Sequence, residues 1–413
     1  MRIALLSYRS KPHCGGQGVY VRHLSRELTA LGHRVEVFSG QPYPELEPGP
    51  VLTEVPSLDL YRDEDPFRTP ALHEYRDWID VLEVAAMKTG AFPEPLTFSL
   101  RALRALRPRR HDFDVVHDNQ VLGYGMLGIR RLGLPLVTSI HHPVSVDRRI
   151  ELEAAHGLAR LSKRRWYAFV RMQGRVAHRV SRHGPILTVS QSSRRDICQD
   201  FGTSPDSVRV IPLGVDTRLF HPRPGPRAPG LIVAVASADS PMKGVTTLLR
   251  AFALVRDADA SARLVVVSKL TPGGPTERLA GELGLGDRVR FRHGMSHVEL
   301  AELLASAEIA VVPSLYEGFS LPAVEHMASG TPLVASRIGA LPEVTGDAAL
   351  LVSPGDAEEL AAALCRLLDH PEERARFGDA ALRRVQERFA WPAVARATVA
   401  QYRDAISPLK SAQ

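Results

Sequence analysis

Strand-like apolar runs alternate with helical patterns along the whole chain, and this alternation constrains the fold more than any other feature. Such alternation is typical of parallel sheets with helices on both faces. Strands are predicted in the first half at 3–7, 35–39, 51–55, 115–117, 136–140, 186–189 and 208–212. Further strands are predicted in the second half at 231–237, 264–268, 289–292, 309–313, 333–336 and 350–352. We therefore expect an α/β protein made of two doubly wound, Rossmann-like domains.

The two halves meet near a proline- and glycine-rich segment, 221–230, with the sequence H-P-R-P-G-P-R-A-P-G and the composition of an interdomain linker. A chain of 413 residues is long enough for two domains, each with its own core. We predict an N-terminal domain over 1–216 and a C-terminal domain over 217–390, with a last helix in 391–413 packing back on the first domain. Two such sheets facing each other would form a deep interdomain cleft for a ligand.

The composition makes several classes of protein improbable. No apolar run approaches the ~20 residues that a membrane-spanning helix needs, and the N-terminal apolar stretch is too short for a signal peptide. Cys14, Cys198 and Cys365 are too few and too far apart to predict a disulfide framework or a metal site. The net charge of +6 comes mostly from arginine, without a nucleic-acid-binding motif. We expect a cytoplasmic protein that binds no nucleic acid and no metal.

The segment 317–325, E-G-F-S-L-P-A-V-E, carries the strongest functional pattern and follows a predicted buried strand. Pro322 suits the first position of a helix, so the amides just before it lack partners within the helix. An N-terminus of this kind, with its partial positive charge, can hold a phosphate group. The amides concerned belong to Phe319, Ser320 and Leu321.

Two carboxylates flank this predicted phosphate site. Glu325 lies in the first turn of the expected helix, where the positive helix end would keep it ionised as an acceptor for paired hydroxyls. Glu317, in the loop, can reach a second set of hydroxyls. Phosphate between two sets of hydroxyls indicates a nucleotide sugar. In the alternative interpretation, Glu325 only complements the helix dipole and Glu317 only solvates its loop.

Two further segments are candidates for phosphate contacts. Lys243 lies in S-P-M-K-G just before a predicted helix at 245–255, where a cation opposes the helix dipole unless an anion sits nearby. The alternative is a solvated surface lysine. Gly16 lies in G-G-Q-G between the first strand and a helix predicted at 19–31, and glycine there permits close approach of the backbone to a ligand. The alternative is a flexible turn.

Histidines stand at the ends of two predicted strands, where site residues of such sheets gather. His141 follows the strand at 136–140, and His117 ends the strand before it. A helix predicted over 158–180 carries an apolar face and an arginine-rich face. The purely structural interpretation is a helix whose apolar face packs on the core and whose basic face is solvated. The functional alternative is an electropositive surface for an anionic membrane or a phosphorylated acceptor.

The segment 317–336 closely resembles the E-x7-E segment of family 4 of the retaining glycosyltransferases, which have the GT-B fold. Supporting segments follow in the expected order: G-G-Q-G-V-Y-V at 15–21, V-T-S-I-H-H at 137–142, L-T-V-S-Q-S-S at 187–193, V-I-P-L-G-V-D at 210–216 and L-L-V-S-P-G-D at 350–356. The resemblance covers nearly the whole chain.

The resemblance implies specific roles for residues of this chain. Glu325 would hold the ribose and Glu317 the donor sugar, while Lys243 and the amides after Gly318 would grip the diphosphate. Gly16 would close on the diphosphate, and His141 would lie beside the sugar and the departing phosphate. The loop with Arg292 and His293 resembles the segment that contacts the base. The implied catalytic residues are His141, Glu317 and Lys243.

One departure concerns the family's usual Gly-Arg pair before the lysine, whose arginine helps to neutralise the diphosphate. Ser237 and Ala238 occupy those positions here, which leaves Ser240 and Lys243, or an arginine from elsewhere, to do this work. The implied activity is metal-independent, retaining transfer of a sugar from a UDP- or GDP-linked donor to a hydroxyl acceptor, with no cofactor beyond this co-substrate. A small molecule, glycan or lipid could be the acceptor, and peripheral membrane contact stays open.

Other activities also stay open at this point. The missing arginine encourages an alternative in which the chain is a catalytically weak or inactive nucleotide-sugar-binding relative that acts with a partner enzyme. A phosphorylase with pyridoxal phosphate on a lysine and a nucleotide-sugar epimerase are further alternatives. Six lysines argue against the phosphorylase, and the E-x7-E context argues against the epimerase.

Overall fold

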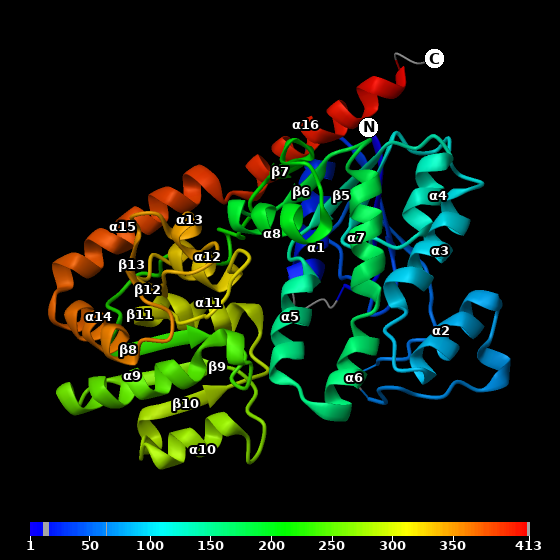
Figure 1. The fold of residues 1–413 in the computed structure, drawn as a ribbon. Helices are drawn as coiled ribbons and strands as arrows, with labels where there is room; N and C mark the ends of the chain where they lie inside the picture. The colour runs from blue at the N-terminus through cyan, green and yellow to red at the C-terminus, as the bar shows by residue number, and fades with distance from the viewer. Residues whose placement is uncertain (11–15, 63, 411–413) are drawn as a thin grey trace. The chain divides into compact units, whose positions relative to one another are not determined.

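The structure, a computed structural model, describes residues 1–10, 16–62 and 64–410. The chain divides into two compact units (Figure 1). Unit 1 is Met1–Ile211 together with Pro392–Gln413, and unit 2 is Pro212–Trp391. The chain thus crosses between the units at Ile211 and again at Trp391, whereas the sequence predicted the first crossing after residue 216.

Unit 1 contains a seven-stranded parallel sheet in the order β3-β2-β1-β4-β5-β6-β7. The strands are β1 Arg2–Ser7, β2 Arg34–Ser39, β3 Val51–Glu54, β4 Val115–Asn119, β5 Leu136–Ile140, β6 Ile186–Thr188 and β7 Val208–Val210. Every strand predicted in this half is present. β4 is longer than predicted and carries Asp118 and Asn119 within the strand.

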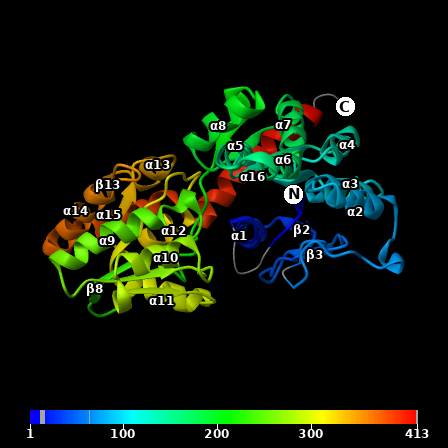
Figure 2. The ribbon, with the colours of Figure 1, turned by 60° about the horizontal axis from the view of Figure 1, so that its bottom comes forward.

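Helices of unit 1 connect these strands. They are α1 Gly16–Ala30, α2 Trp78–Lys88, α3 Glu94–Leu106, α4 Gly125–Arg131, α5 Val144–Ala154, α6 Gly157–Trp166, α7 Phe169–Val180 and α8 Gln191–Phe201, with the short η1 Leu72–Glu74 and η2 Pro205–Ser207. The last helix, α16 Trp391–Lys410, brings the end of the chain to this unit. Helices α2 and α3 lie side by side in both views (Figures 1 and 2).

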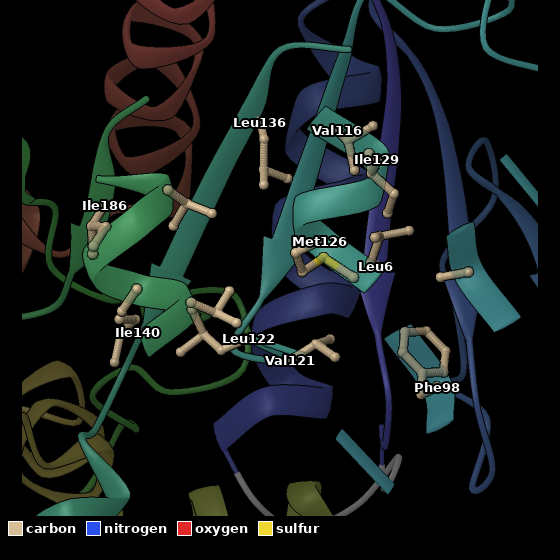
Figure 3. Close-up of a cluster of buried hydrophobic side chains, with 14 of the residues drawn as sticks. Leu6, Phe98, Val116, Val121, Leu122, Met126, Ile129, Leu136, Ile140 and Ile186 are labelled. Atoms are coloured by element: carbon tan, nitrogen blue, oxygen red, sulfur yellow. The ribbon is translucent and has the colours of Figure 1, made fainter. Parts of the chain in front are cut away.

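One cluster of the unit 1 core lies between its sheet and the helices on one face. Leu6 and Val116 project from the strands toward Met126 and Ile129 of α4, and Ile140 belongs to the same cluster (Figure 3). All five side chains are almost completely buried. Burial of apolar area on this scale is the main favourable term in folding, at roughly 25 cal/mol per Å².

The single helix predicted over 158–180 is wrong, because the structure breaks it into α6 and α7 at Tyr167 and Ala168. Tyr167 is buried, and its hydroxyl donates to Glu151 of α5 over 2.9 Å. The break turns Leu158 and Leu161 away from the core, where a continuous helix would have brought Leu158 onto the buried face of α7. These two leucines are 86% and 50% exposed.

Unit 2 contains a six-stranded parallel sheet in the order β10-β9-β8-β11-β12-β13. The strands are β8 Ala228–Val235, β9 Arg263–Val267, β10 Val289–Arg292, β11 Ala307–Val312, β12 Leu333–Ser336 and β13 Ala349–Val352. The helices are α9 Val245–Ala258, α10 Pro275–Glu282, α11 His297–Ser306, α12 Leu321–Ala328, α13 Leu341–Thr345, α14 Ala357–Asp369 and α15 Pro371–Arg388, with η3 Pro241–Lys243 and η4 Gly286–Arg288.

The segment 221–230 does not link the units, contrary to the prediction, because unit 2 already begins at Pro212. Its end is part of β8, and Arg227 anchors it within unit 2. The Arg227 guanidinium donates to the carbonyl oxygens of Ala305, Ala307, Ser329 and Gly330 at 2.7–3.1 Å. A segment fixed by so many hydrogen bonds is part of the domain rather than a hinge. Across the described residues, no helix is long and apolar enough to cross a membrane.

Candidate functional site

Helix α12 begins directly beyond the carboxyl end of β11, as the sequence predicted, but its details differ. Ser320 is the N-cap, and its hydroxyl accepts from the amide of Ala323 over 3.4 Å. Pro322 is therefore the second helical residue, not the first. Ser320 adopts φ of 81°, a left-handed conformation that is uncommon outside glycine. Strain of this kind is concentrated at ligand-binding sites.

Glu325 differs from the prediction in position, and its burial opposes the predicted charge. It is the fifth residue of α12 and so lies beyond the first turn, where the helix dipole acts most strongly. Its side chain is half-buried, and burial raises the pKa of the Glu325 carboxyl to about 7. Burial therefore favours the protonated form of this carboxyl and opposes the ionised state that the helix end was predicted to maintain.

Lys243 and Glu317 form an ion pair. Lys243 Nζ lies 2.8 Å from Glu317 Oε1, and the buried Ser314 hydroxyl donates to the same oxygen over 2.7 Å. Gly244 lets the two loops approach, because a Cβ there would lie 2.0 Å from the carbonyl oxygen of Pro313. A lysine just before a helix was predicted to need an anion nearby. In this structure the Glu317 carboxylate is that anion.

The Glu317 loop is held from its other side as well. Its carbonyl oxygen accepts from the amide of Ala340 over 2.9 Å, and a Cβ at Gly339 would lie 2.3 Å from that oxygen. Glu317 is only 7% exposed. The contacts of Ser314 and Gly339 were not predicted, because nothing in the local pattern around either residue indicates a partner distant in sequence.

The remaining candidates of unit 2 lie along the same carboxyl edge of the sheet. Arg292 ends β10, and His293 follows it with an exposed side chain. Ser240 precedes η3. The Phe319 ring is buried against Phe389, so the backbone of Phe319 is the part that can contact a ligand at the start of α12. Gly318 and Leu321 complete the loop and the start of α12.

Ala238 stands where the arginine was expected and contributes no charge to this edge. Its side chain is buried, and its amide donates to the Ser268 hydroxyl over 2.8 Å. The neighbouring Asp239 accepts from the amides of Thr271 and Thr276. These bonds shape the β8 loop without a cation.

His141 of unit 1 follows β5 and is held on two sides. Its Nε2 lies 2.6 Å from Asn119 Oδ1, and its backbone amide donates to Gln120 over 2.8 Å. The ring packs edge-on against Tyr20, with 4.4 Å between ring centroids. Burial lowers the pKa of His141 to about 4, so the imidazole is neutral at pH 7. An amide oxygen only accepts, so the bond to Asn119 places the proton on Nε2 and leaves Nδ1 as an acceptor.

The loop that carries Gln120 is itself strained and braced. Gln120 and Leu122 have φ of 58° and 51°. The buried Asp118 carboxyl accepts from the amides of Val121 and Leu122 at 2.9 and 3.2 Å. Burial raises the pKa of Asp118 to about 7. A strained loop that fixes one histidine is a feature expected of a binding site.

His117 has a structural position instead. It is fully buried, with Nδ1 2.6 Å from the Tyr402 hydroxyl and Nε2 2.7 Å from the Ser139 hydroxyl. Through this contact α16 is tied to the sheet of unit 1. Gly16 is the first residue of α1, and Gly15 lies outside the described residues. Over the ranges that the structure describes, no group of three or more His, Cys, Asp or Glu could hold a metal ion.

Comparison with known proteins agrees with this geometry. Residues 14–219 match the model described as Glycosyltransferase Family 4, and residues 217–384 match that described as Glycosyl transferases group 1. The chain is 59% identical over 411 residues to the MMP alpha-(1->4)-mannosyltransferase of Mycolicibacterium hassiacum, covering 98% of this chain and 99% of that protein. The chain belongs to glycosyltransferase family 4.

More distant relatives of this glycosyltransferase cover it equally well. The D-inositol 3-phosphate glycosyltransferase of Saccharomonospora viridis is 30% identical over 449 residues, covering 99% of this chain and 95% of that protein. The structure of sucrose-phosphate synthase from Thermosynechococcus elongatus superposes with a TM-score of 0.72 at 24% identity, covering 98% and 99% of the two chains. WaaG, a glycosyltransferase involved in lipopolysaccharide biosynthesis, gives 0.67 at 18% identity, covering 94% and 97%. The fold of the enzyme is GT-B, with two Rossmann-like domains.

Proposed function

We propose that this glycosyltransferase moves a mannosyl unit from a nucleoside diphosphate donor to a hydroxyl of a glycan acceptor, forming an α(1→4) linkage. The relative at 59% identity is a mannosyltransferase of that linkage by name. The observation that carries the proposal is the Lys243–Glu317 ion pair beside the N-terminus of α12. It brings a cation for phosphate and a carboxylate for sugar hydroxyls close to the backbone amides at the start of α12.

The donor would use these groups in order along its length. Arg292 and His293 would contact the base, and Glu325 the ribose hydroxyls. Lys243 and the amides at the start of α12 would hold the diphosphate, with Ser240 and, from the other unit, Gly16 as further contacts. Glu317 would accept hydrogen bonds from the sugar hydroxyls.

Donor binding then requires the ion pair to change partners. Lys243 would turn from Glu317 toward the diphosphate, and Glu317 would exchange the ammonium for hydroxyl groups while Ser314 keeps its carboxylate oriented. Lys243 and the helix dipole would stabilise the leaving diphosphate, because both would already be in place before the bond to the sugar breaks. We propose on this basis that no divalent cation is required.

The anomeric configuration would be retained. Nucleoside diphosphate mannose carries its sugar in the α configuration, so an α product requires attack on the face that the leaving group occupies. The departing phosphate itself would take the proton of the acceptor. His141, neutral and with Nδ1 as an acceptor, would orient a hydroxyl of the transferred sugar rather than act as a base.

Product analysis tests this proposal. The full chain would be incubated with GDP-mannose, UDP-mannose, GDP-glucose or UDP-glucose and an α(1→4)-linked mannose oligosaccharide, with and without EDTA. We expect mannosyl transfer with an α-anomeric proton signal of the new linkage and undiminished turnover in EDTA. A β product would refute retention, exclusive transfer of glucose would refute the sugar, and complete loss in EDTA would refute metal independence.

A further inference from the structure

Six arginines of unit 1 belong to α5, α6 and α7, three helices that lie next to one another in both views (Figures 1 and 2). Within the described residues, none of these guanidinium groups forms an ion pair or a side-chain hydrogen bond. Five of the six are exposed and the first is half-buried. They are Arg148, Arg160, Arg164, Arg165, Arg171 and Arg179, and we call this set the α5–α7 face.

The arginine-rich composition alone does not explain this face. On α2 and α3 of the same unit, arginines are matched by carboxylates: Arg104 pairs with Asp77, and Arg101 pairs with Asp80 and Glu83. On the α5–α7 face two nearby acids are already engaged, whereas Glu153, an exposed acid that lines the larger groove, forms no ion pair within the described residues. Asp200 accepts from Ser145 and Arg149, and Glu151 pairs with Lys163.

The face is also hollowed. A groove of about 770 Å³ is lined by Arg148, Arg171 and Arg179 among others, and a smaller one of about 270 Å³ by Arg148, Arg164, Arg165 and Arg171. The six guanidinium groups line these two grooves and form no ion pair within the described residues, although Glu153 also lines the larger groove. Unpaired guanidinium groups favour phosphate groups as ligands. The neutral glycan acceptor proposed above has no need of them.

Helix α6 adds an apolar element. Leu158 and Leu161 are one turn apart, 86% and 50% exposed, and Arg165 extends the same side of the helix. Arg160 and Arg164 flank them. Exposed leucines beside arginines are typical of a helix that lies in a membrane interface, with the apolar side chains among the acyl chains and the cations at the headgroups. A soluble phosphorylated ligand would leave these leucines in water.

We propose that the α5–α7 face docks the enzyme on an anionic lipid surface. Arginines of α5, α6 and α7 bind the headgroup phosphates, and Leu158 and Leu161 enter the interface. The enzyme therefore works at a membrane surface through a contact separate from its donor residues.

Co-sedimentation of the full chain with vesicles tests this docking. We expect binding to vesicles of phosphatidylcholine with one-third phosphatidylglycerol, no binding to phosphatidylcholine alone, and a steep fall with salt. Replacing Arg160, Arg164 and Arg165 by glutamine should weaken binding about fivefold for each arginine. The matched control replaces Arg250, Arg290 and Arg383 of unit 2, which are also exposed and without partners in the described structure.

The leucines distinguish a lipid surface from a soluble polyanion. Leu158→Ser with Leu161→Ser should reduce vesicle binding at least tenfold, whereas Leu72→Ser with Val81→Ser, equally exposed in unit 1, should not. Transfer in solution should be unchanged in all four variants. Absence of binding to anionic vesicles at low salt would overturn the proposal. The proposal would also be overturned if the leucine variant bound anionic vesicles as well as the unaltered enzyme does and inorganic polyphosphate displaced it from them.

Discussion

The carboxyl edges of the two sheets are built differently, although both carry residues predicted for the site. In unit 1, His141 is fixed by neutral hydrogen bonds that it donates to Asn119 and Gln120. In unit 2, Lys243 and Glu317 neutralise each other across 2.8 Å. The first arrangement can receive a ligand without rearranging, whereas the second must open an ion pair. Under the proposed function, unit 1 would hold the donor sugar with a side chain already in place, and unit 2 would exchange the partners of its ion pair when the donor binds.

Lys243→Ala should have the largest effect. It would remove the charged contact with the diphosphate that we propose for Lys243, which would be worth about 1.5–3 kcal/mol, or roughly 10- to 150-fold in donor affinity. Calorimetry with GDP and UDP measures it. Lys88→Ala is the matched control, since Lys88 is an exposed lysine at the end of α2 in unit 1. Equal affinities of Lys243→Ala and the unaltered enzyme would show that this edge does not bind phosphate.

The ion pair also shows where sequence reasoning stops. The strands of both sheets were predictable because buried parallel strands are short apolar runs, and β5, β10 and β12 match residue for residue. Lys243 and Glu317 were each predicted as site residues, but their contact joins residues 74 positions apart, and no local pattern records it. The same holds for Asn119 and His141, which adjacent strands bring together.

The break between α6 and α7 was missed for a different reason. The helical period of apolar residues continues across Tyr167, so the pattern cannot show that the chain changes direction there. The raised pKa of Glu325 could not be predicted, because a sequence shows the helix end but not the burial of the carboxyl.

Glu325 should make donor affinity depend on pH. Burial raises its pKa to about 7, and the ribose hydroxyls require the ionised carboxylate as an acceptor. Below pH 7 the Glu325 carboxyl of the free enzyme is protonated and must lose its proton when the donor binds. Donor affinity should therefore fall by up to tenfold, about 1.4 kcal/mol, for each pH unit below 7. Above pH 8 it should be constant. Glu325→Gln should remove this dependence between pH 5.5 and 8, as measured by calorimetry in buffers of different ionisation enthalpy. A persisting slope would assign the titration to another group.

Asn119→Asp tests the fixed edge of unit 1. The new carboxylate would face His141 Nε2 at the present 2.6 Å and should raise the pKa of His141 from about 4 by roughly 1–3 units. Protonation then occupies Nδ1, and activity should fall on the acid side of the pH profile at a higher pH than before. Donor affinity in unit 2 should change little. An unshifted profile in a folded variant would mean that the protonation state of His141 is irrelevant to turnover.

Ser320→Gly should have the smallest effect and compares strain at the two edges. Gln120, Leu122 and Ser320 all have φ between 51° and 81°, but only Ser320 also caps a helix. Glycine relieves the left-handed strain of about 1–2 kcal/mol, and loses a few tenths as a cap and about 0.5–1 kcal/mol in chain entropy. The net change in the free energy of unfolding should stay within about 1 kcal/mol and favour glycine. Ser320→Ala keeps the strain and loses the cap, so it should destabilise by about 1 kcal/mol. Denaturant unfolding measures both variants. If alanine proved as stable as glycine, the left-handed backbone at Ser320 would not be strained, and the two edges would differ in that respect too.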